Sequence, residues 1–137
     1  MSWRDDLDPR DPRAQVKLYE YTLPGGWEVL AGRASRDNDV LSLKIARPND
    51  WWFHVRGMPG SHVVLRVPSG QEPDRETVQA AAAIAAWHCK KRDARQVPVT
   101  ATRARNVSKP RGAPAGTVEV RKETVLKVRP AIPESEA

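Results

Sequence analysis

The chain has little cysteine, little phenylalanine and no long hydrophobic run, and these shortages exclude several classes of protein. Cys89 is the single cysteine among 137 residues, so no intramolecular disulfide can form, and a reducing compartment is favoured. No stretch approaches the roughly 18 apolar residues that a membrane span requires. The charged amino terminus lacks the apolar segment of a secretory signal. We therefore expect one soluble domain in the cytoplasm, with no membrane contact.

Acidic residues are scarce in one part of the chain. Between positions 90 and 111, a single acid, Asp93, stands against eight basic residues: Lys90, Lys91, Arg92, Arg95, Arg103, Arg105, Lys109 and Arg111. This stretch carries +7 and the whole chain +6, so the rest of the chain sums to −1 and the basicity is local. A local basic patch is typical of proteins that meet a polyanion such as a nucleic acid. A solvated face is the alternative, and charge alone does not decide between the two.

The residue pattern predicts an α+β fold with a mostly antiparallel sheet. Alternation and turn residues predict strands over 17–23, 27–31, 51–55, 62–67 and 97–103, and a closing hairpin from 118–120 and 124–128. Pro98 suggests that 97–103 is an edge strand. Asn38 or Asp39 would cap a short helix over about 38–46. Asp74 would cap one long alanine-rich helix over about 74–92, packed against the sheet.

Composition also predicts where the domain begins and ends. Residues 1–15 are rich in Asp, Arg and Pro and have little to bury, so a flexible charged arm is expected. The domain itself is expected over 16–130. Residues 131–137 are expected to form a flexible tail.

The densest cluster of chemically versatile residues is 50–62, DWWFHVRGMPGSH. A turn within it would bring His54 and His62 together, with Arg56 and Ser61 beside them. Aromatic, His and Arg side chains stack on unpaired bases, and Arg also pairs with phosphate. Because neighbouring strand residues face opposite ways, at least one of the two tryptophans is expected in the core.

Other cations are candidates for phosphate contact. Lys109 and Arg111 flank Pro110, so a rigid Pro/Gly loop would present two positive charges. Arg33 and Arg36 lie in a polar loop before the short helix. The remaining basic candidates are Lys90, Lys91, Arg103 and Arg105.

Catalysis and metal binding are weaker hypotheses. A Ser61–His62 pair would need a carboxylate to orient the histidine, and Asp50 is the only acid nearby. A centre in which His54 and His62 act as acid and base, with Arg56 on a phosphate, is more plausible. The histidines and Cys89 have no standard zinc spacing. We therefore expect no catalytic residue, no metal and no cofactor, and a buried Cys89.

At these residues the sequence resembles the NFACT-R domain, the RNA-binding module of NFACT proteins. The resemblance runs from about residue 25 to 130 and follows the family's order. It is carried by Gly32-Arg33, Asp50-Trp-Trp-Phe-His54, Pro59-Gly-Ser-His-Val63, the alanine-rich helix ending in Lys90-Lys91, Val97-Pro98-Val99 and Val107-Ser-Lys-Pro-Arg-Gly112. There are departures: Ala34 stands where the family often has Asn, and 100–105 lacks a frequent Tyr-Thr pair.

The resemblance implies RNA binding, to tRNA or ribosomal RNA, in translation, ribosome quality control or RNA processing, and no catalysis. The RNA-binding residues expected are His54, Arg56, Ser61, His62, Arg33, Arg36, Lys90, Lys91, Arg103, Arg105, Lys109 and Arg111. Peptide tailing on the ribosome is not implied, because only the R module is matched. Two alternatives stay open: an RNA-processing or RNA-modifying enzyme that uses His54, His62 and Arg56, and an adaptor that docks the ribosome or RNA-processing proteins. DNA is a weaker option than RNA.

Overall fold

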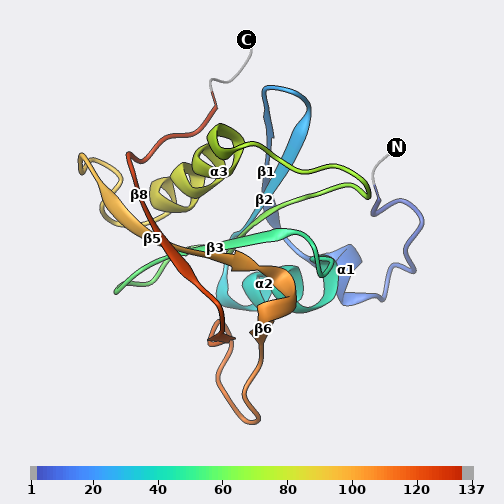
Figure 1. Ribbon diagram of the computed structural model, residues 1–137. Helices are drawn as coiled ribbons and strands as arrows, with labels where there is room; N and C mark the ends of the chain where they lie inside the picture. Colours follow the sequence, from blue (N-terminus) through green and yellow to red (C-terminus); the bar gives the residue numbers. More distant parts are fainter. Residues whose placement is uncertain (1–2, 134–137) are drawn as a thin grey trace.

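A computed structural model describes residues 3–133 and contains one antiparallel sheet between two helical layers (Figure 1). The six strands lie in the order β1-β2-β4-β3-β5-β8. Their bounds are Leu18–Leu23, Trp27–Gly32, Val63–Leu65, Trp51–Val55, Val97–Arg103 and Thr124–Val128. The predicted α+β class is confirmed.

Helix α3, Arg75–Trp87, covers one face of the sheet. Its buried side chains are Ala81, Ala82, Ile84, Ala85 and Ala86, which pack with the main core cluster. Small side chains allow the helix to lie close to the strands, where Phe53 and Val63 are fully buried. The Asp74 carboxylate accepts a hydrogen bond from the Thr77 amide at 2.8 Å, so the predicted cap is confirmed.

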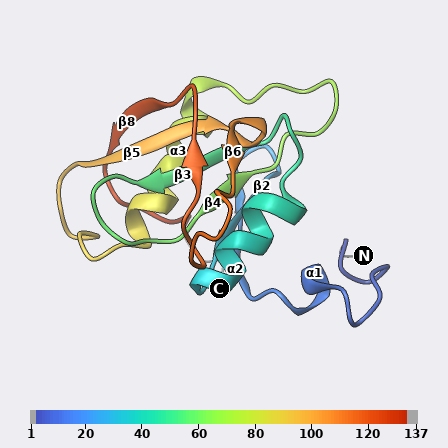
Figure 2. The same cartoon turned by 90° about the horizontal axis from the view of Figure 1, so that it is seen from below.

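The opposite face is covered by helix α2, Ser35–Val40, and the π-helical turn η1, Leu41–Ile45. Figures 1 and 2 show α2 and α3 on opposite sides of the sheet. A second core cluster lies here, with Leu41, Trp52 and Val64 at its centre. The 3-10 turn η2, Ala104–Asn106, leads into a separate two-stranded sheet of β6, Val107–Ser108, and β7, Glu119–Val120.

The predicted short helix over 38–46 begins earlier than expected. Helix α2 starts at Ser35 after Ala34, and no side chain caps it. Asn38 and Asp39 therefore lie inside the helix instead of capping it. The side chains serve other segments: Asp37 accepts from the Lys17 amide and Asn38 from the His62 amide, both at 3.0 Å.

The long helix ends earlier than the predicted 74–92. It stops at Trp87, and His88 leaves the helical conformation with φ −86° and ψ 47°. The next residue, Cys89, forms an isolated β-bridge with Gly60, so the chain after α3 runs beside the Gly57–Gly60 turn. Lys90, Lys91 and Arg92 lie beyond the helix, although the sequence had placed them inside it.

Two predicted strand pairings are also wrong. Strand β5 is internal, between β3 and β8, although Pro98 suggested an edge. The Pro98 carbonyl still accepts from the Arg56 amide at 2.9 Å, so the proline removes only a donor. Strand β7 pairs with β6, whereas β8 pairs with β5, and the expected closing hairpin does not form.

The predicted arm contains a short helix, α1, Pro12–Gln15, capped by the Asp11 side chain. Trp3 packs against the second core cluster, and the Arg4 Nη1 donates to the Val16 carbonyl at 2.7 Å. Residues 1–2 of the arm and 134–137 of the tail lie outside the described residues. Within residues 3–133, no helix is both long and apolar enough to cross a bilayer.

Candidate functional site

His62 lies at the centre of a hydrogen-bond chain beneath helix α2. It is 2% exposed, and its Nδ1 lies 2.8 Å from the Ser42 hydroxyl. The same hydroxyl accepts from the Trp52 Nε1–H at 2.8 Å. The other ring nitrogen, Nε2, lies 3.2 Å from the Gly116 carbonyl. Burial, above all, and the neighbouring His54 lower the pKa of His62 to about 4. His62 is therefore neutral at physiological pH, with both nitrogens engaged.

The two histidines of the cluster do come together, as the turn predicted. Their ring centroids lie 5.4 Å apart at an edge-to-face angle, and His54 also stacks with Trp52 at 6.1 Å. Burial lowers the pKa of His54 as well. Trp52 is 2% exposed, which confirms that at least one of the paired tryptophans belongs to the core.

Asp50 does not orient either histidine. Its carboxylate accepts from the Val67 amide at 2.8 Å and from the Arg47 amide at 2.9 Å, and pairs with Arg66 Nε at 3.4 Å. The side chain is 1% exposed. Asp50 thus ties strand β3 to the segments beside it. A histidine that needs a carboxylate partner for acid–base work does not find one in this residue.

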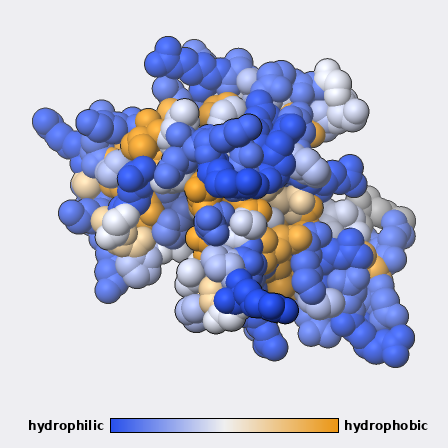
Figure 3. Space-filling view, turned by 60° about the horizontal axis from the view of Figure 1, so that its bottom comes forward, coloured by the Kyte–Doolittle hydropathy of each residue, from blue (hydrophilic) through white to orange (hydrophobic). Residues whose placement is uncertain are grey.

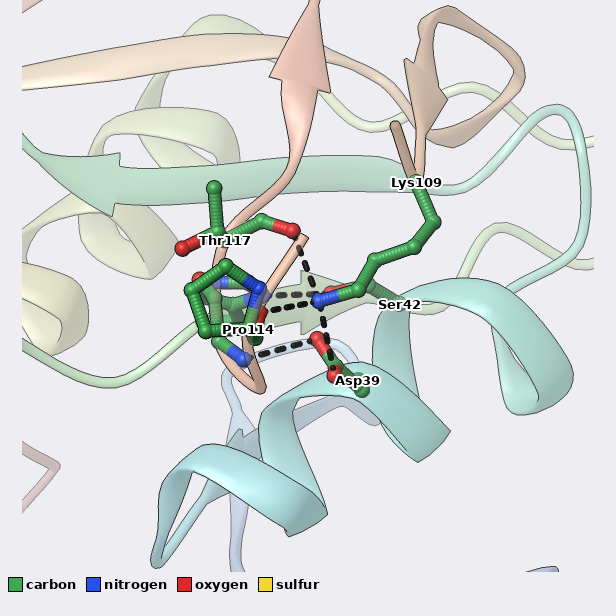
Figure 4. Close-up of polar contacts among 7 residues, drawn as sticks. Asp39, Ser42, Lys109, Pro114 and Thr117 are labelled. Atoms are coloured by element: carbon green, nitrogen blue, oxygen red, sulfur yellow. Dashed lines mark hydrogen bonds and ion pairs between the residues drawn. The ribbon is translucent and has the colours of Figure 1, made fainter. Parts of the chain in front are cut away.

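Lys109 reaches back into the domain (Figure 4). Its Nζ donates to Asp39 at 3.1 Å, to the Thr117 carbonyl at 2.9 Å and to the Pro114 carbonyl. The other Asp39 oxygen accepts from the Gly116 amide at 3.1 Å. This lysine and Asp39 together fasten the loop of residues 109–117, called here the clamped loop, onto helix α2. Gly116 has φ +85°, a backbone conformation that residues with a side chain rarely adopt.

The remaining basic candidates lie on separate elements, and of these only Arg103 belongs to a strand of the six-stranded sheet. Arg56 is exposed and pairs with Glu123 at 3.4 Å. Arg103 pairs with Glu72 and lies over the Trp51 ring, 4.3 Å from its centroid. Arg105 donates to Asn49 Oδ1 at 2.7 Å. Arg36 and Lys17 line a small hollow of their own. Arg111 is exposed on the clamped loop.

Three of the predicted residues line a hollow of about 610 Å³ at the end of the sheet where β1 begins and β2 ends. Arg33, Ser61 and Lys90 line it, with Lys91 next in the chain. Ser61 Oγ donates to the Gly32 carbonyl at 2.6 Å, which joins the segment after the Gly57–Gly60 turn to strand β2. We call this feature the basic hollow, and its cations come from the end of β2 and from the segment after α3.

Three residues that line the basic hollow were not predicted to bind RNA: Tyr19, His88 and Arg92. Tyr19 and His88 stack with ring centroids 4.4 Å apart, and the Arg33 guanidinium lies 4.9 Å from the Tyr19 centroid. The signal for Arg92 was present in the basic run. Tyr19 and His88 are far apart in the sequence, and no local spacing connects them.

No cluster of three metal-ligating side chains occurs among residues 3–133. The chemistry that this part of the chain offers is stacking, hydrogen bonding and positive charge. Figure 3 shows hydrophilic side chains over much of one face, with apolar patches between them.

Comparison with curated proteins finds related segments in several bacteria. The chain is 37% identical over 131 residues to the "Rqc2 homolog RqcH" of Bacillus subtilis, a match that covers 90% of this chain and 22% of that protein. It is 35% identical over 102 residues to the protein of the same name from Streptococcus suis, which covers 74% and 18% respectively. The chain thus spans about a fifth of the length of these relatives.

A solved structure has the same fold. It is the C-terminal part of the fibronectin/fibrinogen-binding protein from Streptococcus suis, with a TM-score of 0.77 and 34% identity. The match covers 84% of this chain and 46% of that one. Residues 17–122 match the family described as NFACT protein RNA binding domain, which is most of the chain. The chain belongs to this family, as the motifs around His54, His62 and Lys109 indicated.

Proposed function

We propose that this domain binds RNA and that positively charged side chains around the basic hollow hold the phosphate backbone. The single observation that carries the proposal is that three cations, Arg33, Lys90 and Arg92, line one hollow, whereas Asp93 is the one acidic residue in its lining. Lys91 and Arg95 add exposed cations to the same segment. Cations that neutralise phosphates release counterions, which supplies most of the sequence-independent affinity. The family supports the same conclusion.

The RNA we propose is tRNA or ribosomal RNA, bound in the course of translation or ribosome quality control. The similarity to the RqcH proteins supports this assignment, although the chain matches about a fifth of them. The ribosome and RNA-processing proteins are the partners we propose, in the cytoplasm. Cosedimentation of the protein with large ribosomal subunits, before and after nuclease treatment, separates contact through RNA from contact through protein.

The test is the affinity for tRNA measured against salt concentration. We expect the logarithm of the association constant to fall linearly with the logarithm of salt, with a slope of about −0.9 per phosphate contact on duplex regions. Replacing Lys90 and Lys91 together by glutamine should make the slope less steep. A flat salt curve, or no binding of tRNA or ribosomal RNA, would overturn the proposal.

A charge-matched control is available at the opposite end of the sheet. Arg121 and Lys122 are exposed, and the carbonyls of both accept from the Thr102 hydroxyl. Thr102 pairs with Trp52 near the start of β3, so the two cations lie at that end of the strand. The basic hollow lies instead beyond the end of β3 that leads into the Gly57–Gly60 turn. Replacing Arg121 and Lys122 by glutamine removes the same charge and should leave the slope nearly unchanged. Equal losses from both double variants would mean that net charge, and not the basic hollow, governs binding. Competition between matched RNA and DNA tests the preference for RNA.

Catalysis is not part of the proposal, and the burial of His62 supports this choice. An acid–base residue must exchange protons with its substrate, whereas both nitrogens of His62 are occupied by Ser42 and Gly116. Incubation of tRNA with the pure protein, followed by mass analysis, should return an unchanged substrate. Cleavage or a mass change that disappears in a His54→Gln variant would establish an enzyme instead.

A further inference from the structure

The basic hollow contains a stacking platform that phosphate binding alone does not require. Tyr19 lies on the edge strand β1 and is 37% exposed, although a tyrosine ring is a large apolar surface. His88 stacks on it at 4.4 Å with an interplanar angle of 23°. Arg33 covers the same tyrosine with its guanidinium. Arg33, Tyr19 and His88 all line the hollow, and we call the three side chains the platform.

The His88 ring is held in place from behind. The Tyr21 hydroxyl and the His88 Nε2 are joined by a hydrogen bond of 2.6 Å. The His88 carbonyl accepts from the Ser61 amide at 3.4 Å, and the Gly60–Cys89 bridge fixes the next residue. Burial lowers the pKa of His88 to about 4, so the ring is neutral at physiological pH. A neutral ring that is held by a hydrogen bond and by stacking is a preorganised support for a second aromatic plane.

Cations line the same hollow as the platform. Lys90 and Arg92 line the hollow with Arg33, and Arg92 lies 5.1 Å from the Trp87 ring centroid. An arginine held over an aromatic ring presents its planar fork of donors, which suits a phosphate group. The volume of about 610 Å³ falls in the range of about 300–1,000 Å³ that is typical of small-ligand sites.

We propose that the basic hollow binds one unpaired nucleotide of the RNA, with the base stacked on the Arg33–Tyr19–His88 platform and its phosphate held by Lys90 and Arg92. This inference rests on the proposed function and adds that the recognised RNA is single-stranded at this point. Bases in a duplex are stacked on their neighbours and expose no face to a protein platform, whereas unpaired bases stack on aromatic rings and guanidinium planes. Stacking of this kind tolerates every base.

The test compares a short single-stranded oligoadenylate with a blunt-ended duplex RNA, by fluorescence anisotropy. The Tyr19→Ser variant should lose affinity for the single strand by about 5- to 150-fold, the range that corresponds to loss of one stacked base. Affinity for the duplex should not change. Tyr19→Phe keeps the ring and should bind the single strand like the wild type. Val125→Ser, an exposed position on the other edge strand, serves as the control for loss of apolar surface.

Two further readouts separate stacking from charge. A 2-aminopurine placed in the oligonucleotide should lose fluorescence when the wild type binds, because its ring stacks, and should lose much less with Tyr19→Ser. The salt slope should be unchanged in Tyr19→Ser but less steep, by about 0.7, in Arg92→Gln. If Tyr19→Ser binds the single strand as tightly as the wild type, or loses duplex affinity equally, the inference is wrong. Binding of tRNA without binding of oligoadenylate also overturns the inference and leaves the proposed function standing, whereas failure to bind any RNA removes both.

Discussion

The Nε2–H of His62 donates to the Gly116 carbonyl, 3.2 Å away, so the residue just before β4 is tied to the far end of the clamped loop. The donor is fixed by elimination, because a carbonyl oxygen only accepts. The neutral ring then accepts at Nδ1, so the Ser42 hydroxyl donates to it while accepting from Trp52 Nε1–H. With this placement of the hydrogens, the Trp52 indole, the Ser42 hydroxyl, the His62 ring and the Gly116 carbonyl all have a hydrogen-bond partner. The motif histidine thus acts as an internal connector that shapes the surface.

Ser42→Ala should destabilise the domain by about 1–3 kcal/mol, because it leaves the Trp52 Nε1–H and the His62 Nδ1 buried without a partner. Urea denaturation followed by tryptophan fluorescence measures the change. Ser69→Ala, at an exposed loop position, is the matched control and should have little effect. A stability equal to the wild type in Ser42→Ala would show that this hydroxyl does not hold the chain of hydrogen bonds together.

Acid should weaken the fold well above the pH at which carboxylates titrate. The pKa of His62 is about 4 in the folded protein against 6.5 ordinarily, so between these values the unfolded state binds a proton that the folded state does not. The free energy of unfolding should therefore fall as the pH falls from 6.5 to 4, by up to about 1.4 kcal/mol per pH unit for this one group.

The histidines can be followed individually in this range. His88 also has a pKa lowered to about 4, and that of His54 is lowered, so both contribute in the same direction. Nuclear magnetic resonance titration of the three imidazole rings assigns each contribution, and urea denaturation at each pH gives the sum. If the His62 ring titrates near 6.5 in the folded protein, the buried chain of hydrogen bonds is absent in solution.

The sequence predicted those elements whose residues are neighbours in the chain. Alternation located most of the strands, and Asp74 marked the start of α3, because each signal is local. The sequence placed the end of α3 too late. The helix ends where His88 contacts Tyr19 and Tyr21 on β1, which lie far away in the sequence. No window around residue 88 contains that information.

The candidate site divides in the same way. The approach of His54 to His62 followed from one turn between two strands and was predicted correctly. The platform of Tyr19 and His88 was missed because β1 and the end of α3 become neighbours only through the fold. The contacts of the predicted phosphate ligands with RNA stay predictions, and the internal contacts of Lys109 suggest a different role for that residue.

Gly32→Ala should be strongly destabilising, although the backbone there is not left-handed. A Cβ at this position would lie 2.0 Å from the Asn38 Oδ1 and 2.9 Å from the Asn38 amide nitrogen. The Asn38 side chain would have to move, which would break the hydrogen bond that its Oδ1 accepts from the His62 amide. A loss of about 2 kcal/mol or more is expected for such a clash with a broken buried hydrogen bond.

Gly112→Ala is the comparison for that experiment. Its φ is +76°, and a Cβ would meet nothing within 4 Å, so only the left-handed backbone is penalised, by about 1–2 kcal/mol. Thermal unfolding of both variants measures the difference, and the exchange of the His62 amide hydrogen should quicken in Gly32→Ala alone. Equal effects of the two substitutions would show that Asn38 moves aside at little cost.

Lys109 and Arg111 flank the same proline but should behave differently when replaced by methionine. Lys109→Met removes three donated hydrogen bonds and leaves Asp39 without its cation, so the clamped loop should detach. Hydrogen exchange of the amides in the clamped loop, which the prolines lack, should then accelerate, together with a loss of RNA affinity. Arg111 is exposed, and its replacement should lower the affinity and the salt slope while exchange stays as in the wild type. The reverse outcome, with slow exchange in Lys109→Met and a reduced salt slope, would return Lys109 to the role of a phosphate ligand.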